Sequence, residues 1–249
     1  MADEFANVYE DSARAEAYAG LEYPGTYFLA FRDLPTILLA HVRGTRALDF
    51  GCGTGRSTRF LRDLGFHVVG IDIAEPMLAQ ARARDPDGDY RLAPRDGPPL
   101  VLTGAFDLVL AAFTFDNVPT VATKVSLFRT LRASLTPEGR VVAIVSAPAI
   151  YLHEWVSFST RAFPQNREAR SGDVVRIVML DVLDRRPVED ILCTDDTYRS
   201  VFSQAGLAVI DSYQPLGDAS EPFDWVTETT VAPWTIYVLG GTPGAGGAG

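Results

Sequence analysis

The chain has 249 residues, a length that suits one large α/β domain or two small ones. Its 47% apolar and 22% charged residues are typical of a globular protein and exclude disordered, collagen-like and disulfide-rich classes. The 32 acidic residues outnumber the 22 basic ones, and the net charge of −10 argues against nucleic acid or an anionic membrane as a partner.

Apolar runs of strand length alternate with segments of helical period, which predicts βαβ units and a parallel sheet. Residues 1–45 are expected to form a helical lid with a break at Pro24-Gly25. The expected strands are 46–50, 67–71, 90–92, 106–113, 140–146, 207–213 and 234–239, and the expected helices are 56–64, one after Asp72, one through Leu127 to Leu135 and one after Thr194.

This alternation stops after residue 147. Residues 148–172 are aromatic and polar without a period, and 174–182 and 187–193 are predicted to be two strands joined by a charged turn. We therefore expect 46–147 to be a cofactor-binding core, 148–193 a substrate-side β insertion and 194–240 a C-terminal helix with strands. The glycine-rich end, 241–249, is expected to be a flexible tail.

A glycine-rich turn, Asp49-Phe-Gly-Cys-Gly-Thr-Gly55, closes the first predicted strand of the core and opens a helix. Glycines at such a position permit positive φ angles and let a ligand lie against the backbone. Asp72 follows Gly51 by 21 residues, at the end of the next strand, where a carboxylate can accept both hydroxyl protons of a ribose. The pattern predicts a ribose-bearing cofactor.

The spacing of the glycines indicates which kind of cofactor. The dinucleotide fingerprint G-x-G-x-x-G requires a third glycine where this chain has Arg56, whereas the third glycine here is Gly55. The carboxylate of Asp49 suits an ammonium group and would repel a pyrophosphate. We therefore expect a cofactor with a ribose and a cationic group but no pyrophosphate.

At four places the sequence resembles the class I S-adenosylmethionine-dependent methyltransferases of the small-molecule type. The matching segments are Leu48-Asp-Phe-Gly-Cys-Gly-Thr-Gly55, Gly70-Ile-Asp-Ile-Ala-Glu-Pro-Met-Leu78, Phe106-Asp-Leu-Val109 and Leu135-Thr-Pro-Glu-Gly139. The resemblance covers 45–147 well and 194–239 more loosely. It implies an α/β, Rossmann-like, doubly wound domain over residues 1–240, with seven strands that are mostly parallel and a last strand that is antiparallel.

The resemblance also implies S-adenosylmethionine as the cofactor and a set of residues that bind it. Asp72 would hold the ribose, Ile73 would pack on the adenine, and Ala112 and Phe113 would border the methyl group. Tyr27 in the lid is a further candidate, through its ring face. The residue that contacts the adenine amino group is left open between Arg95 and Asp96. The amino-acid end would be held by the glycine-turn residues Asp49, Gly51, Gly53 and Gly55, and Cys52 and Met77 complete the candidate set.

Candidates for catalysis are fewer. His153 lies among aromatic residues beyond the fifth core strand, where Glu154 could orient it as a general base, although a structural or surface histidine is the favoured alternative. Asp116 and Asn117 follow the fourth strand and either hydrogen-bond the acceptor or cap the next helix. No metal site is expected.

These features predict a methyltransferase that moves a methyl group to an oxygen or nitrogen of a small molecule. Two alternatives stay open: a related protein that binds the cofactor without methylating, and a nicotinamide-dependent oxidoreductase, against which Arg56 argues. Two cysteines, Cys52 and Cys193, and an acidic N-terminus favour a cytoplasmic protein. We expect a monomer or homodimer with no nucleic-acid or membrane partner.

Overall fold

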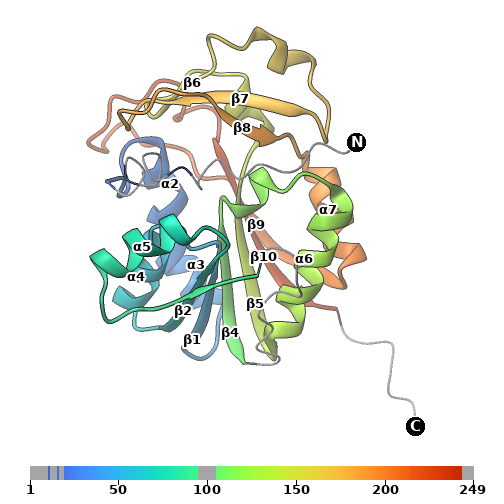
Figure 1. Cartoon of the computed structure of the whole chain (residues 1–249). Helices are drawn as coiled ribbons and strands as arrows, with labels where there is room; N and C mark the ends of the chain where they lie inside the picture. Colours follow the sequence, from blue (N-terminus) through green and yellow to red (C-terminus); the bar gives the residue numbers. More distant parts are fainter. Residues whose placement is uncertain (1–10, 12–15, 17–19, 95–104, 243–249) are drawn as a thin grey trace.

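A computed structural model describes residues 11, 16, 20–94 and 105–242, and a seven-stranded sheet lies at its centre (Figure 1). The strand order is β3-β2-β1-β4-β5-β10-β9. Neighbours from β3 to β5 pair in parallel, and β10 runs antiparallel to both β5 and β9. The predicted fold class is therefore confirmed. The strands are β1 (Arg46–Phe50), β2 (His67–Asp72), β3 (Asp89–Leu92), β4 (Phe106–Ala112), β5 (Leu135–Ser146), β9 (Leu207–Tyr213) and β10 (Trp234–Gly241).

Helices cover both faces of this sheet, with α3, α4 and α5 on one side and α6 and α7 on the other (Figure 1). The core strands supply side chains to both sides. In β5, Val142 and Ile144 join the apolar core beneath α2 and α3, while Val141, Ala143 and Val145 join the core beneath α6 and α7. The helices are α2 (Thr26–Arg32), α3 (Leu34–His41), α4 (Arg56–Asp63), α5 (Glu75–Arg84), α6 (Val121–Ser134) and α7 (Asp195–Gln204).

One predicted boundary is wrong. The helix was expected to include Leu135 and the strand to begin at Arg140, but α6 ends at Ser134 and β5 begins at Leu135. Thr136 precedes a proline, which disfavours helical backbone and favours the extended conformation. Leu135 pairs with Phe106 of β4, and a Cβ at Gly139 would lie 2.8 Å from the Phe106 carbonyl oxygen. The irregular start of β5 therefore needs a glycine where it approaches β4.

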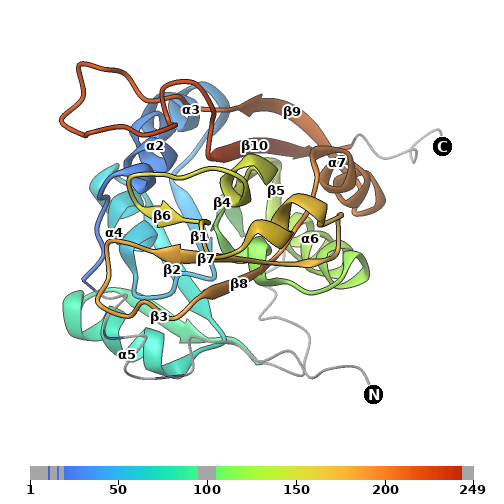
Figure 2. The same cartoon turned by 90° about the horizontal axis from the view of Figure 1, so that it is seen from above.

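A second, three-stranded antiparallel sheet lies above the main sheet (Figure 1). It is made of β6 (Phe158–Ser159), β7 (Val174–Met179) and β8 (Val188–Ile191), and the last two fall inside the two strands predicted for the insertion. Seen from above in Figure 2, β6, β7 and β8 pass over the ends of the core strands. The short helical turns of this half of the molecule are η2 (Thr114–Asn117), η3 (Pro148–Tyr151) and η4 (Pro164–Glu168).

A buried carboxylate joins α2 to the loop that precedes β6. Glu228, in the loop before β10, is fully buried and accepts hydrogen bonds from the Thr26 hydroxyl at 2.6 Å and the Val156 N–H at 2.8 Å. The Ser157 hydroxyl in turn accepts from the Thr26 N–H at 2.9 Å. Three segments far apart in sequence thus meet at one charged group whose lone pairs are occupied by donors.

The helical lid is described only in part. After the predicted break, Gly25 has a positive φ of 46° and α2 begins at Thr26. Most of the segment before Pro24 lies outside the described residues, as do Arg95, Asp96 and positions 243–249 of the predicted tail. Within the described part of the chain, no helix is both long and apolar enough to cross a membrane.

Candidate functional site

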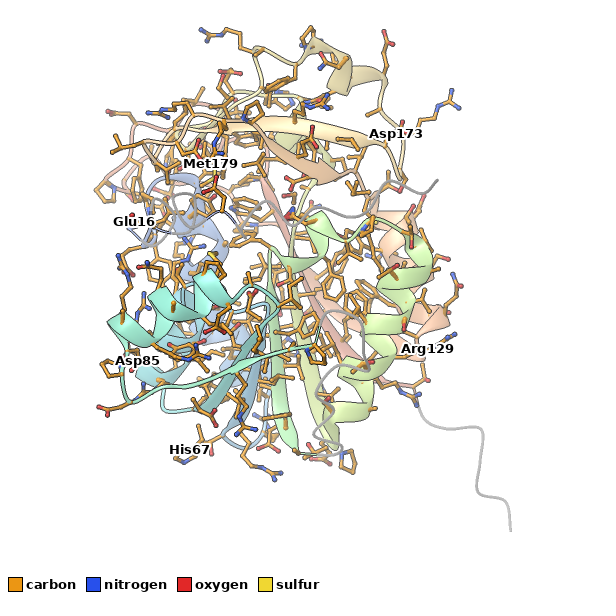
Figure 3. The ribbon with its side chains drawn as sticks, viewed as in Figure 1. Glu16, His67, Asp85, Arg129, Asp173 and Met179 are labelled. Carbon is orange, nitrogen blue, oxygen red and sulfur yellow. The ribbon has the colours of Figure 1, made fainter. Side chains whose placement is uncertain are left out.

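A cavity of about 520 Å³ lies between the ends of the core strands and the upper sheet. This volume falls within the usual range of small-molecule sites. In Figure 3, Met179 of β7 lies in the upper layer, while His67, at the start of β2, lies at the opposite end of the main sheet. One end of the cavity wall is the glycine turn and the end of β2, with Gly51, Cys52, Gly53, Asp72, Ile73 and Met77. The middle is mostly aromatic, with Tyr27, Phe31, Arg56, Ala112, Phe113 and Trp234. The other end is mostly polar, with Asp116, Asn117, Ser146, Tyr151, Ile177 and Asp190.

The glycine turn forms the first end. Gly51, Gly53 and Gly55 have φ angles of 73°, 53° and 79°, in the region that side chains other than glycine rarely adopt. The N–H groups of Gly51 and Cys52 both donate to the Ile71 carbonyl, at 2.8 and 3.0 Å, which ties the turn to β2. A Cβ on Gly51 would lie 2.4 Å from the Thr114 hydroxyl oxygen. The turn therefore presents bare backbone to the cavity, because a side chain at Gly51 would clash with Thr114.

Gly55 serves a different purpose from the one expected. It is not part of the cavity wall, and a Cβ there would lie 2.5 Å from the Tyr90 hydroxyl oxygen. Its expected contact with the amino-acid end of the cofactor is corrected: this glycine lets Tyr90 of β3 pack behind the turn, which supports the cofactor end indirectly.

Asp49 is also placed behind the turn rather than in the cavity wall. It is fully buried, and one carboxylate oxygen, Oδ2, accepts from the hydroxyls of Ser57 at 2.7 Å and Thr58 at 2.6 Å. The other oxygen, Oδ1, is buried without a hydrogen-bond partner. Burial raises the pKa of the Asp49 carboxyl to about 6, against the two hydroxyl hydrogen bonds. The expected direct contact with an ammonium group is therefore corrected: Asp49 can act on a charged group in the cavity only by long-range electrostatics.

Asp72 does reach the cavity, at the C-terminal end of β2. Its Oδ2 accepts from the Gly53 N–H at 2.8 Å and its Oδ1 from the Ala74 N–H at 2.9 Å. Burial raises the pKa of this carboxyl, and the backbone N–H groups partly oppose the shift. Each oxygen retains a lone pair, so the side chain can accept two further hydrogen bonds from neighbouring hydroxyls.

Apolar side chains complete this end. Cys52 is buried and its thiol pKa is raised well above the ordinary value by desolvation. Met77 places its terminal methyl 3.1 Å from the position that a Cβ on Gly53 would take. Ile73 lines the cavity with 37% of its surface exposed. Cys52, Ile73 and Met77 are thus brought together as expected, around a space suited to a flat apolar group.

An arginine enclosed by aromatic rings lies in the middle of the cavity. The guanidinium carbon of Arg56 is 4.9 Å from the ring centre of Tyr27, 5.4 Å from Phe31 and 5.9 Å from Phe113. It is 7% exposed and donates to the Glu22 carbonyl at 2.6 Å. In the sequence, Arg56 is recognisable only as a departure from the dinucleotide pattern, and no motif predicts that it lines the cavity.

Phe113 is the one described non-glycine residue with a positive φ, 62°. It follows β4, and its ring centre lies 4.7 Å from Trp234 and 5.7 Å from Tyr27. Strained backbone of this kind is concentrated at functional sites. Ala112 and Phe113 both line the cavity, as does Tyr27, so the structure brings these three predicted residues together.

The other end of the cavity holds two buried carboxylates. Asp116 accepts from the Ser146 N–H at 3.1 Å and from its hydroxyl at 2.9 Å. Asp190 of β8 accepts from the Asn117 side-chain amide at 2.5 Å and from the Tyr151 hydroxyl at 3.0 Å. Burial raises the pKa of both carboxyls, and for Asp116 the neighbouring charge of Asp190 adds to the shift. Asp116 and Asn117 therefore lie in the site, and neither provides the helix cap that was the alternative, because Thr120 caps α6.

His153 is not brought into the site. It is exposed and is not part of the cavity wall. Glu154, expected to orient it, instead accepts from the Ser159 hydroxyl and the Thr160 N–H, both at 2.8 Å. The prediction of His153 as a general base is corrected: the turn after η3 directs this side chain to solvent and Trp155 into the core.

Asp190 and Tyr151 were missed in the sequence analysis. A signal for Asp190 exists, because residues two apart in a strand share a face and Val188 is apolar and buried. An acidic residue on the inward face of a strand points to a polar site. For Tyr151 no comparable signal exists, because it lies in a segment without a period. Among the described residues, no group of three or more His, Cys, Asp or Glu side chains could hold a metal ion.

The residues at the glycine-turn end fit the cofactor that the resemblance implies. Gly51 and Gly53 line the cavity with backbone, and a Cβ on either would meet Thr114 or Met77. Asp72 has lone pairs for ribose hydroxyls, and Arg56 offers a cation to a carboxylate. The contacts of Gly51 and Gly55 with protein side chains account for these two glycines without a bound pyrophosphate.

Comparison with known proteins agrees with this geometry. A family model described as a methyltransferase domain matches residues 48–141. The chain is 30% identical over 218 residues to a trans-aconitate 2-methyltransferase of Variovorax paradoxus, covering 79% of this chain and 73% of that protein. It is 34% identical over 137 residues to a demethylmenaquinone methyltransferase of Beutenbergia cavernae, covering 51% of this chain and 55% of that protein.

A solved structure extends the likeness to the fold. The crystal structure of an S-adenosylmethionine-dependent methyltransferase from Mesorhizobium loti matches with a TM-score of 0.60 at 24% identity, covering 87% of this chain and 98% of that one.

Proposed function

Because the chain belongs to the family of class I S-adenosylmethionine-dependent methyltransferases, we propose that it moves a methyl group from this cofactor to an oxygen or nitrogen of a small molecule. The observation that carries the proposal is one continuous cavity: the glycine turn and Asp72 line one end, and polar side chains of the core and the insertion line the other. A donor and an acceptor can therefore meet inside it.

The cofactor end supplies binding and orientation. Gly51 and Gly53 give close access to the backbone, Asp72 accepts from ribose hydroxyls, Ile73 and Met77 enclose the adenine side, and Arg56 pairs with the carboxylate of the amino-acid end. When bound, S-adenosylmethionine supplies an electrophilic methyl group on a cationic sulfur. Alignment and exclusion of water are what such a displacement requires from the protein.

Aromatic rings form the wall in the middle of the cavity. Tyr27 and Phe113 line the passage between the two ends, and the Arg56 guanidinium lies 4.9 and 5.9 Å from their ring centres. Trp234 donates its indole N–H to the Thr26 carbonyl at 2.8 Å, which fixes its ring against Phe113. These contacts support a rigid apolar wall beside the proposed position of the methyl group.

We further propose that residues 1–240 act as one domain in which 148–193 is a substrate-side insertion. The support is that Phe158, Ile177 and Met179 of the insertion lie in the cavity wall opposite the glycine turn. The free thiols of Cys52 and Cys193, both buried, support a cytoplasmic location. The net charge of −10 supports a small molecule over nucleic acid as the methyl acceptor. We also propose that the protein acts as a monomer or a homodimer.

Calorimetric titration with S-adenosylmethionine and with NADH tests the cofactor, and transfer of a labelled methyl group to a panel of small molecules tests the activity. Tight binding of NADH without binding of S-adenosylmethionine would contradict the proposed methyltransferase function. Binding of S-adenosylmethionine with no transfer to any member of the panel would favour the alternative of a protein that binds the cofactor without methylating.

A further inference from the structure

The acidic end of the cavity carries information about the acceptor. Asp116 comes from η2 after β4, and Asp190 comes from β8 in the insertion, 74 positions later in the chain. Both line the cavity, and their exposed fractions are only 6% and 7%. The two carboxylates therefore belong to the wall of a built site whose other end holds the glycine turn, and are not a patch of surface charge.

The protein surrounds these carboxylates with neutral donors. Asp116 is bound by Ser146, and Asp190 by Asn117 and Tyr151. Among the described residues, no lysine, arginine or histidine forms an ion pair with either carboxylate within 4.0 Å.

The nearest buried cation does not neutralise the pair by contact. Lys124 of α6 is 1% exposed, and its ammonium group donates to the Phe115 carbonyl. It is not part of the cavity wall. Buried carboxylates normally require a paired cation, so the cavity face of this pair is suited to a ligand that brings one.

Beyond Asn117, Ser146 and Tyr151, which bind the two carboxylates, the walls near this end are apolar. They are formed by Ile150, Phe158, Ile177, Met179 and Val188. An anionic ligand would further disfavour the charged forms of the two carboxyls in a medium of low dielectric constant, whereas an ammonium group would stabilise those charged forms. The apolar walls require that the remainder of the ligand be a hydrocarbon or aromatic group.

We propose that the methyl acceptor is an amine on an apolar scaffold, with its nitrogen held between Asp116 and Asp190. This inference rests on the proposed function and narrows it from oxygen or nitrogen to nitrogen. It also separates this chain from its trans-aconitate relatives, since trans-aconitate is an anion with three carboxylates.

The same pair provides a route for the proton. An ammonium group has no free electron pair, so an oxygen of Asp116 or Asp190 first takes one of its protons. The nitrogen lone pair then forms the new N–C bond as the S–C bond breaks, and the electrons of that bond stay on sulfur. The product leaves as a methylated ammonium ion, and the carboxyl returns its proton to solvent. Burial raises the pKa of both carboxyls, which makes each a stronger proton acceptor.

A matched series tests the class of acceptor: 3-phenylpropylamine, 3-phenyl-1-propanol and 3-phenylpropanoate share one scaffold and differ in the terminal group. With the full chain and labelled S-adenosylmethionine, we expect transfer to the amine to exceed transfer to the other two by at least about tenfold. Preference for the alcohol or the acid would overturn the amine inference and leave the proposed function standing. If the chain binds the cofactor but methylates none of these or of a wider panel, the proposed function fails and the amine inference falls with it.

Substitution tests the two residues. Asp190→Asn keeps an acceptor oxygen for Asn117 or Tyr151 but removes the charge, and we expect kcat/KM for the amine to fall about 10²-fold. Affinity for the amine in calorimetric titration should fall as well, while affinity for S-adenosylmethionine should stay within about twofold because Asp190 lies at the far end. We expect the same losses of kcat/KM and amine affinity for Asp116→Asn, and this variant replaces Asp190→Asn in the test if Asp190→Asn does not fold.

Glu189→Gln is the matched control, since Glu189 precedes Asp190 in β8 but is exposed and paired with Arg176 at 2.7 Å. It should leave amine binding and kcat/KM unchanged. Unchanged kcat/KM and amine affinity in folded Asp190→Asn and Asp116→Asn would overturn the inference.

Discussion

The glycine-turn end of the cavity and its acidic end are built from different parts of the chain. The first uses residues 51–77, one continuous segment that contains the glycine turn, α4, β2 and the start of α5, and most of its polar contacts involve backbone groups. The second uses side chains from η2, β5, η3 and β8, which are separated by up to 74 positions and meet through side-chain hydrogen bonds. A cofactor shared by a whole family can be held by local backbone geometry, whereas an acceptor is selected by side chains that long-range packing brings together.

The sharpest test of the backbone end is Gly51→Val. The new side chain would need a φ of 73° and would place its Cβ 2.4 Å from the Thr114 hydroxyl, so the turn that lines the cavity would have to change its backbone conformation. We expect affinity for S-adenosylmethionine to fall by at least about 100-fold, measured by calorimetric titration of the folded protein.

The matched control is Gly65→Ala. Gly65 has a φ of 90°, but no atom lies within 4 Å of its Cβ position. This variant should lose about 1 kcal/mol of unfolding free energy, through backbone strain, and bind the cofactor normally. Equal affinities in both variants would show that the turn is not a binding element.

The second test concerns the one side chain on which the cofactor end depends. Asp72→Asn keeps an oxygen that accepts from Gly53 or Ala74 but loses acceptor capacity toward ribose hydroxyls. We expect cofactor affinity to fall by about 1–3 kcal/mol, with amine affinity unchanged. Retained cofactor affinity would remove Asp72 from the ribose site.

The pH dependence of stability tests the carboxylate behind the turn. The folded-state pKa of Asp49 is raised to about 6 from an ordinary value of 3.8, so the folded state binds more protons than the unfolded state between these values. Stability contributed by the protonated group is therefore lost as pH rises through that window. We expect Asp49→Asn to gain about 1 kcal/mol relative to the wild type between pH 5 and pH 7.5, in urea unfolding.

Ser57→Ala provides the complementary variant. It removes a hydroxyl that stabilises the charged carboxylate, so the pH dependence should become steeper than in the wild type. If the stability difference between Asp49→Asn and the wild type does not change with pH, the buried carboxylate does not titrate in this range.

The smallest effect is expected for His153, which lies outside the acidic end of the cavity. His153→Ala should change kcat/KM by less than about twofold, because this side chain is exposed and does not line the cavity. A loss of tenfold or more in kcat with unchanged cofactor affinity would restore His153 as the general base and contradict the position described above.

Much of the cofactor end was predictable from the sequence because its determinants are local. A glycine turn between a strand and a helix, and a carboxylate at the next strand end, stand at defined distances along the chain, and β1 and β2 pair in register. The roles of Gly55 and Asp49 were not predictable, since they depend on Tyr90 and on the two hydroxyls of α4 that pack behind the turn.

By itself the sequence determined the alternation of strands and helices, the glycine turn and the position of Asp72, because backbone conformation and hydrophobic period act over a few residues. Only the tertiary structure decided that Asp190 joins Asn117 and Tyr151, that Arg56 lies among aromatic rings, and that His153 faces solvent. The reason is that β8 crosses the ends of the core strands, and no short-range pattern specifies which side chains that crossing brings together.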